Sequence, residues 1–254
     1  MSTYKLVRVE RTHNGDVLEV TLDSPETGNA FSLAMIEELT DVFTSMQDDR
    51  SVRAMVLSGA GENFGLGGQR SEFEGLNASD GGDDMWTLGR KARRMCSVLA
   101  ESDKVKIAKV HGKAVGAGFV VPLLCNLRVA TQAATFRLPE AGLGVPPAWG
   151  GILGRLIKVI GHSAATELVL TSRVVRAEEA RQLGVVHAVV PDEEGALDTQ
   201  VERWLRPMLR RRDNGSLATT VAILNAYADT SDQMNGAGLD IPLLASSVAM
   251  NTER

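Results

Sequence analysis

The sequence predicts a mixed α/β fold, and three patterns near its start lead to this prediction. Apolar and polar residues alternate at 6–10 and again at 17–22, as they do in half-buried strands. The next segment has apolar residues at helical spacing, and residues 52–58 form a short apolar run of the kind found in a buried strand. A hairpin, a helix and a further strand therefore open the chain.

Local signals justify each of these first elements. Between the two alternating segments lie His13, Asn14, Gly15 and Asp16, which suit the turn of an antiparallel hairpin. Ser32 is the expected N-cap of the helix, because its hydroxyl can accept a bond from a first-turn N–H. The face expected to be buried consists of Met35, Ile36, Leu39, Val42, Phe43 and Met46.

A glycine-rich loop follows at residues 59–68, where five glycines are too many for a helix or a strand. Two interpretations stay open for it. Its free N–H groups face a ligand, or it is a plain tight turn. Because no Gly-Lys-Ser/Thr follows, a nucleotide phosphate loop is disfavoured.

The middle of the chain continues the α/β pattern. Residues 76–84 are polar and glycine-rich, which predicts a mobile surface loop, and residues 85–99 predict a helix whose apolar stripe faces either the core or an acyl group. A nearly all-apolar helix begins at about Ala117, and its first N–H groups can point at negative charge. Short strands are expected at residues 105–110, 128–130 and 135–137. Helices are expected at residues 162–172, 176–186, 197–209 and 217–227.

Composition limits the classes of function. A chain of 254 residues with 44% hydrophobic residues can bury a large core, and its net charge of −5 argues against a nucleic-acid surface. Cys96 and Cys125 have no metal-ligand spacing, so neither a zinc site nor a disulfide is expected. The compartment expected for the protein is a reducing cytoplasm. No stretch reaches the ~18 uninterrupted apolar residues of a membrane span.

Five segments together carry a resemblance to a known family. The chain resembles the crotonase superfamily, the enoyl-CoA hydratase and isomerase family, in the order and spacing of these segments over most of its length. They are GNAFS at 28–32, GAGENFGLGG at 59–68, KIAKVHGKAVGAG at 106–118, CNLRVATQAATFRLPEAGLGVPPAWGG at 125–151 and LTSRVVRAEEARQLGVVHAVVP at 170–191.

The resemblance implies an α/β spiral of ββα repeats at residues 1–191 and a helical C-terminal region at 192–254. It implies a homotrimer or hexamer and an acyl-CoA thioester substrate, with no metal and no cofactor besides the coenzyme A of the substrate. The thioester oxygen would receive backbone N–H bonds from Leu66 and Ala117, an oxyanion hole. The other substrate-binding positions implied are Ala30, Gly67, Gly68, Gly116, Val120 and Trp149.

The acids of this chain depart from those of the hydratases. Those enzymes carry two glutamates, and the positions that match are Val120 and Glu140 here. Adding water needs two groups that hold and activate it, whereas moving a double bond needs one base. The pattern is similar to that of single-glutamate enoyl-CoA isomerases, with Glu140 as the base. The plainer interpretation makes Glu140 an N-cap or a surface ion-pair partner.

Other departures leave alternatives open. Gln69, His111 and Ala117 stand where the family commonly has aspartate, asparagine and glycine. His111 is either an ordinary histidine at a strand end or a second polar group, as in some C–C bond hydrolases of the superfamily. A hydratase and a non-catalytic acyl-CoA-binding relative are the further alternatives.

Overall fold

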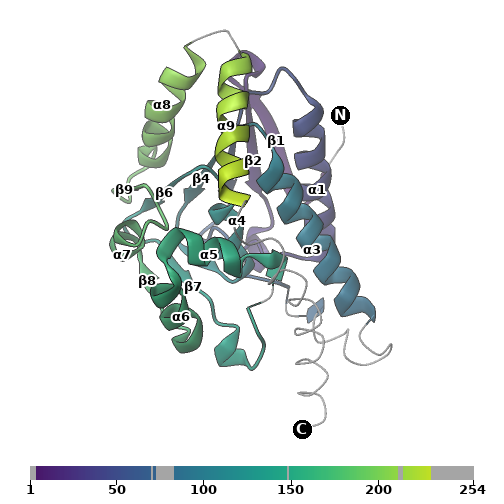
Figure 1. Ribbon diagram of the computed structural model, residues 1–254, viewed down its shortest axis with the longest axis vertical. Helices are drawn as coiled ribbons and strands as arrows, with labels where there is room; N and C mark the ends of the chain where they lie inside the picture. Colours follow the sequence, from purple (N-terminus) through teal and green to yellow (C-terminus); the bar gives the residue numbers. More distant parts are fainter. Residues whose placement is uncertain (1–3, 70, 73–82, 148, 211–213, 230–254) are drawn as a thin grey trace.

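The computed structural model describes residues 4–69, 71–72, 83–147, 149–210 and 214–229 (Figure 1). Its strands form a sheet of six, in the order β1-β2-β3-β4-β6-β9, and a sheet of three, in the order β5-β7-β8. The strands are β1 (Val7–Thr12), β2 (Val17–Leu22), β3 (Ala54–Gly59), β4 (Val105–Val110), β5 (Lys113–Val115), β6 (Leu127–Thr131), β7 (Thr135–Arg137), β8 (Val175–Arg176) and β9 (Ala188–Val190). The helices are α1 (Leu33–Asp48), α3 (Asp83–Glu101), α4 (Ala117–Leu123), α5 (Leu153–Ile160), α6 (His162–Thr171), α7 (Ala177–Gln182), α8 (Ala196–Leu209) and α9 (Asn214–Asp229).

The large sheet begins with the predicted hairpin. Strands β1 and β2 pair antiparallel, with Val7 opposite Leu22, and the 3₁₀ turn η1 (His13–Gly15) joins them. Every later pair in this sheet is parallel. The prediction of a hairpin followed by buried strands is confirmed.

The chain then winds between the two sheets. Strand β4 of the large sheet is followed by β5 of the small one, helix α4 leads back to β6, and β7 returns to the small sheet. This repeated strand, strand and helix order makes the predicted spiral. It also places the starts of α4 and of the segment after β7 next to one another, because β5 and β7 pair in parallel.

Helix α1 follows the sequence prediction closely. The hydroxyl of Ser32 accepts a hydrogen bond from the N–H of Met35 at 3.1 Å, and all six residues of the predicted stripe are buried. A cap of this kind contributes about 1 kcal/mol. Glu72 adds a second cap, since its Oε2 accepts from the N–H of Leu33 at 2.8 Å. Glu72 is therefore engaged in holding α1.

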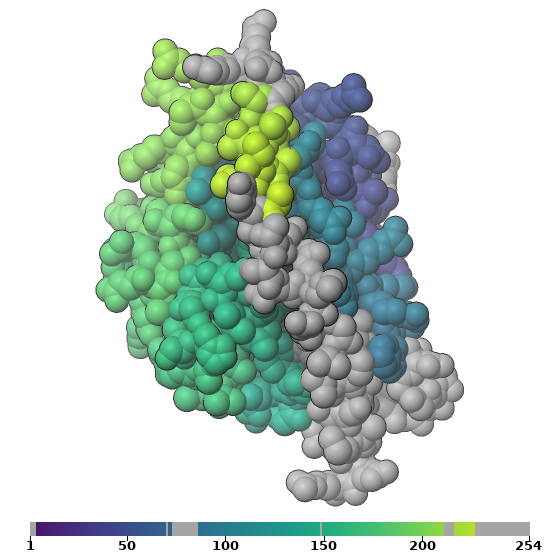
Figure 2. All heavy atoms as spheres, in the orientation of Figure 1, coloured from purple at the N-terminus to yellow at the C-terminus, as the bar shows by residue number. Residues whose placement is uncertain are grey.

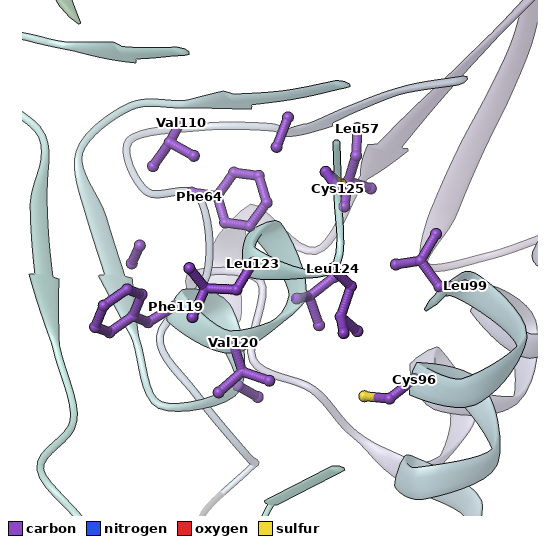
Figure 3. Close-up of a cluster of buried hydrophobic side chains, with 14 of the residues drawn as sticks. Leu57, Phe64, Cys96, Leu99, Val110, Phe119, Val120, Leu123, Leu124 and Cys125 are labelled. Carbon is purple, nitrogen blue, oxygen red and sulfur yellow. The ribbon is translucent and has the colours of Figure 1, made fainter. Parts of the chain in front are cut away.

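Helix α4 lies in the centre of the core and has no exposed face, because all of its residues are buried. Figure 3 shows Phe119, Val120, Leu123 and Leu124 leaving the helix in different directions among other apolar side chains. The helix lasts only from Ala117 to Leu123, and Pro122 near its end is compatible with so short a helix.

The C-terminal helices cover the outer side of the large sheet. A second apolar cluster joins strand residues such as Val56 and Val129 to Val201 and Leu205 of α8 and Val221 of α9. In Figure 2, α8 and α9 occupy the upper part of the face, in green and yellow. Arg53 fixes this arrangement, because its guanidinium donates to the carbonyls of Met208 and Leu209 at 2.9 and 3.1 Å.

Some predicted boundaries change. Helix α5 was not predicted, and α7 ends at Gln182 because Gly184 adopts a φ of 82° that a helix cannot continue through. Most of the loop predicted at 76–84 lies outside the described residues, and its last two residues begin α3. No helix in the described ranges is both long and apolar enough to span a membrane.

Candidate active site

The site is built where the glycine loop at 59–68 meets the turn between β5 and α4. The N–H of Gly65 donates to the carbonyl of Lys113 at 3.1 Å, and the N–H of Val115 donates to the carbonyl of Gly65 at 2.9 Å. The two backbones approach so closely that a Cβ on Gly118 would lie 2.1 Å from the carbonyl oxygen of Gly65. Glycine is therefore required at this contact.

Ala117 begins helix α4 and offers one free N–H. Gly116 precedes it with a φ of 50°, and the carbonyl of Gly116 accepts from the N–H groups of Phe119 and Val120. The N–H of Ala117 has no acceptor in the described part of the chain. It points outward from a helix start, where the aligned peptide dipoles favour negative charge.

Leu66 does not offer a free N–H. It donates to the carbonyl of Gly28 at 3.0 Å, and its side chain lies against Gly28, leaving 38% of the residue exposed. The expectation that Leu66 donates to the substrate oxygen therefore needs correction for this conformation. Motif spacing alone did not reveal that Gly28, far away in sequence, already accepts this bond.

Gly68, two residues further on, offers an N–H that makes no backbone hydrogen bond in the described part of the chain. A parallel bridge pairs it with Phe31, in which Phe31 N–H donates to the carbonyl of Gly67 at 2.8 Å and Gln69 N–H donates to the carbonyl of Phe31 at 3.1 Å. Residues alternate in direction along such a strand, so the N–H of Gly68 points away from Phe31. Within the described ranges it has no acceptor.

Glu140 lies beside these donors. The carbonyl of Arg137, at the end of β7, accepts from Gly116 N–H at 2.9 Å and so fixes the approach of this segment. A Cβ on Gly116 would lie 3.0 Å from Oε1 of Glu140 and 3.6 Å from the Cα of Gly67. The carboxylate and the two glycine turns therefore meet at one place.

The surroundings of Glu140 suit a base. Its Oε2 is buried and has no hydrogen-bond partner, and burial raises the pKa of the carboxyl group above its ordinary value, with its own backbone N–H lowering it by a smaller amount. The side chain caps no helix, and no ion pair reaches it from the described residues. Neither of the plainer roles expected for Glu140 is present.

Val120 and Trp149 complete the neighbourhood. Val120 is 1% exposed and belongs to the core, so no second carboxylate stands at the start of α4. Trp149 packs edge-on against Phe31 with ring centroids 5.5 Å apart, and its indole N–H is buried without an acceptor. Ala30 precedes Phe31 and donates its N–H to the hydroxyl of Thr27 at 3.3 Å.

His111 and Asn29 behave differently from what the sequence suggested. The ring of His111 lies 2.9 Å from the carbonyl of Gly61, so it bonds to the glycine loop. Asn29 was not among the predicted site residues, yet it is fully buried and makes three side-chain bonds around this loop. Its place inside GNAFS, one of the segments that carry the resemblance, was the available signal.

Comparison with known proteins identifies the family of this chain. The family described as enoyl-CoA hydratase/isomerase matches residues 12–250. The chain belongs to this family and is one of its acyl-CoA enzymes. The assembly of this chain as a trimer or hexamer stays a prediction.

Individual relatives are similar over most of the chain. A short-chain-enoyl-CoA hydratase of Clostridium acetobutylicum is 35% identical over 181 residues, 71% of this chain and 67% of the relative. A carnitinyl-CoA dehydratase of Escherichia coli is 34% identical over 221 residues, 87% of this chain and 80% of the relative. The crystal structure of an enoyl-CoA hydratase/isomerase from Marinobacter aquaeolei has a TM-score of 0.80 at 32% identity, covering 98% of this chain and 92% of that one.

Proposed function

We propose that this enzyme moves the double bond of a 3-enoyl-CoA to the 2-position, with Glu140 as its single base. The observation that carries the proposal is the carboxylate of Glu140 beside the two glycine turns. Glu140 is half-buried and adjacent to the two glycine turns, its Oε2 is buried without a hydrogen-bond partner, and the position of a second glutamate is the core residue Val120.

The reaction follows from where the groups lie. Glu140 removes a proton from C2, and the electron pair moves toward the thioester oxygen, giving a dienolate. The N–H groups of Ala117 and Gly68 donate to that oxygen, and preorganised donors of this kind lower the barrier because charge on the oxygen grows in the transition state. Glu140 then returns the proton to C4, so that no water is consumed.

A 3-enoyl-CoA assay tests this mechanism. Purified enzyme is expected to produce the conjugated 2-enoyl-CoA, followed by ultraviolet absorbance, and Glu140→Gln is expected to lower kcat by at least about 1,000-fold because the amide cannot take a proton. Glu72→Gln changes a nearby carboxylate that caps α1 and serves as the matched control. Isomerisation that persists in Glu140→Gln contradicts the single-base mechanism.

A second candidate reaction is hydration of a 2-enoyl-CoA or its reverse, dehydration. The printed names of the two relatives above, a hydratase and a dehydratase, favour it. The buried Val120 opposes it, because activation of water by two carboxylates needs a polar group there. Formation of 3-hydroxyacyl-CoA by the wild type, detected by mass, would favour hydration over isomerisation.

If the wild type binds acyl-CoA and catalyses neither reaction, the enzyme proposal fails and a binding role replaces it. Cleavage of a β-diketone substrate that is lost in His111→Ala would instead support the C–C bond hydrolase alternative. A panel of acyl-CoA thioesters separates these outcomes, since each reaction gives a product of different mass or absorbance.

A further inference from the structure

We propose that Asn29 is a positioning residue of the oxyanion hole, and that its buried amide sets the position of the Gly68 N–H. The inference rests on the proposed function only in taking Gly68 as a donor to the thioester oxygen. It is carried by the hydrogen bonds of Asn29 and by the backbone bonds of the segment that contains it.

The side chain of Asn29 uses both ends of its amide. Its Oδ1 accepts from the N–H of Ser24 at 2.9 Å, and its Nδ2 donates to the carbonyls of Ala60 and Asn63, each at 2.8 Å. The residue is 0% exposed. One buried amide therefore joins the turn at 24–29 to the first half of the glycine loop.

The backbone around Asn29 holds the second half of the same loop. Gly28 accepts from Leu66 N–H, Phe31 donates to the carbonyl of Gly67, and Phe31 accepts from Gln69 N–H. These bonds lie on both sides of Gly68, so a displacement of residues 28–31 moves this donor as well. Asn29 is the residue through which this segment is fixed to residues 60 and 63.

The loop has little room to adopt another position. A Cβ on Gly59 would lie 2.7 Å from the carbonyl oxygen of Phe64 and 3.0 Å from Nδ2 of Asn29, and one on Gly61 would lie 2.7 Å from Cβ of Pro25. Asn29 itself has a φ of 56°, a left-handed conformation that asparagine and glycine adopt more readily than other residues. Both its backbone and its amide suit this place.

Asn29→Gly tests the inference because glycine keeps the left-handed backbone and removes only the side-chain bonds. We expect kcat to fall by about 10- to 100-fold with KM changed by less than about threefold, since a small displacement of a donor weakens transition-state binding more than ground-state binding. Asn14→Gly is the matched control, because Asn14 is also left-handed, with a φ of 58°, and is exposed in the hairpin turn.

A spectroscopic measurement reads the hydrogen bond itself. In wild-type enzyme, the infrared carbonyl stretch of a bound saturated acyl-CoA, labelled with carbon-13 at the thioester, is expected to shift to lower frequency as the oxyanion hole polarises it. Asn29→Gly is expected to lose most of this shift while still binding the thioester. Deuterium exchange at C2 of the same ligand is expected to slow in parallel.

The carbonyl shift and the exchange at C2 do not depend on the isomerase reaction. If the wild type shows the shift and the exchange but no isomerisation, the proposed function fails and the role of Asn29 stands. An unchanged shift and kcat in a folded Asn29→Gly enzyme would overturn the inference. Should Asn29→Gly not fold, Asn29→Asp is the second variant. Its carboxylate still accepts from Ser24 N–H but cannot donate to the carbonyls of Ala60 and Asn63. An unchanged carbonyl shift in Asn29→Asp would overturn the inference equally.

Discussion

At the scale of single residues, the base proposed for the reaction, Glu140, also carries a cost in stability. A base acts only when ionised, and burial raises the pKa of this carboxyl group above 4.5. The acid limb of kcat/KM against pH is therefore expected above 4.5, because activity rises with pH through the raised pKa. A limb at or below this value would show that another group limits the rate.

The same shift predicts a stability effect of opposite sign to the activity effect. A carboxyl group with a raised pKa in the folded state adds stability at low pH, and this contribution is lost as pH rises through that pKa. Glu140→Gln removes the charge of a half-buried carboxyl group whose Oε2 has no partner, so we expect a higher Tm than wild type above neutral pH, by about 2–4 °C for each kcal/mol recovered. In thermal unfolding scans the difference in Tm between Glu140→Gln and wild type should shrink toward about pH 4, where the side chain at position 140 is mostly uncharged in both proteins.

The residue scale also shows where reasoning from sequence stops. Glu140 and Ala117 were predicted as site residues from a carboxylate after a proline, the start of an apolar helix and the family resemblance, and their roles stay predictions. Leu66 was predicted as a donor although its N–H is bonded to Gly28, because which N–H is free depends on the bonds made by Gly28 and Phe31. Spacing within a motif does not contain that information.

At the scale of elements, the contact between α4 and the glycine loop requires that position 118 has no side chain beyond its hydrogen. Gly118→Ala would place a Cβ 2.1 Å from the carbonyl oxygen of Gly65, where only backbone movement makes room. We expect at least about a 100-fold loss of kcat, because the backbones that carry both donors are forced apart. Steady-state kinetics and circular dichroism separate this loss from unfolding.

Gly154→Ala is the matched control for that substitution. Gly154 lies inside α5, and a Cβ there would meet nothing within 4 Å. Alanine is favoured over glycine in a helix by up to about 1 kcal/mol, so Tm is expected to rise slightly with kcat unchanged. A fall in kcat for Gly154→Ala would mean that the site responds to changes far from the glycine contact.

Element boundaries were predictable where local chemistry sets them. Ser32 marked the start of α1, and the periodicity of apolar residues identified its buried face correctly. The short strands were harder, because β8 and β9 consist of two and three residues and are defined by their partners. Membership of the six-stranded or the three-stranded sheet depends on pairing across the chain.

At the scale of the whole molecule, His187 links the last strand of the large sheet to the C-terminal helices. Its Nδ1 accepts from Arg128 N–H at 3.1 Å, and its ring lies edge-on to Trp204 of α8 with centroids 6.4 Å apart. Burial, together with the charge of Arg128, lowers the pKa of His187 from 6.5 to about 4. The folded protein therefore resists protonation of this ring.

That pKa predicts how stability falls in acid. The stability contribution of neutral His187 is complete above pH 6.5, is lost as pH falls from 6.5 to about 4, and changes no further below that. We expect Tm to fall over this range more steeply in wild type than in His187→Gln. His162→Gln, at an exposed position, controls for the loss of a histidine. Equal slopes in wild type and His187→Gln would contradict the prediction.

The burial of α4 has a consequence for how such an enzyme diversifies. Every residue of α4 is buried, so substitutions on the molecular surface do not reach the N–H of Ala117 at its start. Such substitutions leave the dipole of the helix unchanged. Trp149 and Ala30, by contrast, are partly exposed. Substitutions at these two positions therefore change the surface near Phe31 without changing the buried helix.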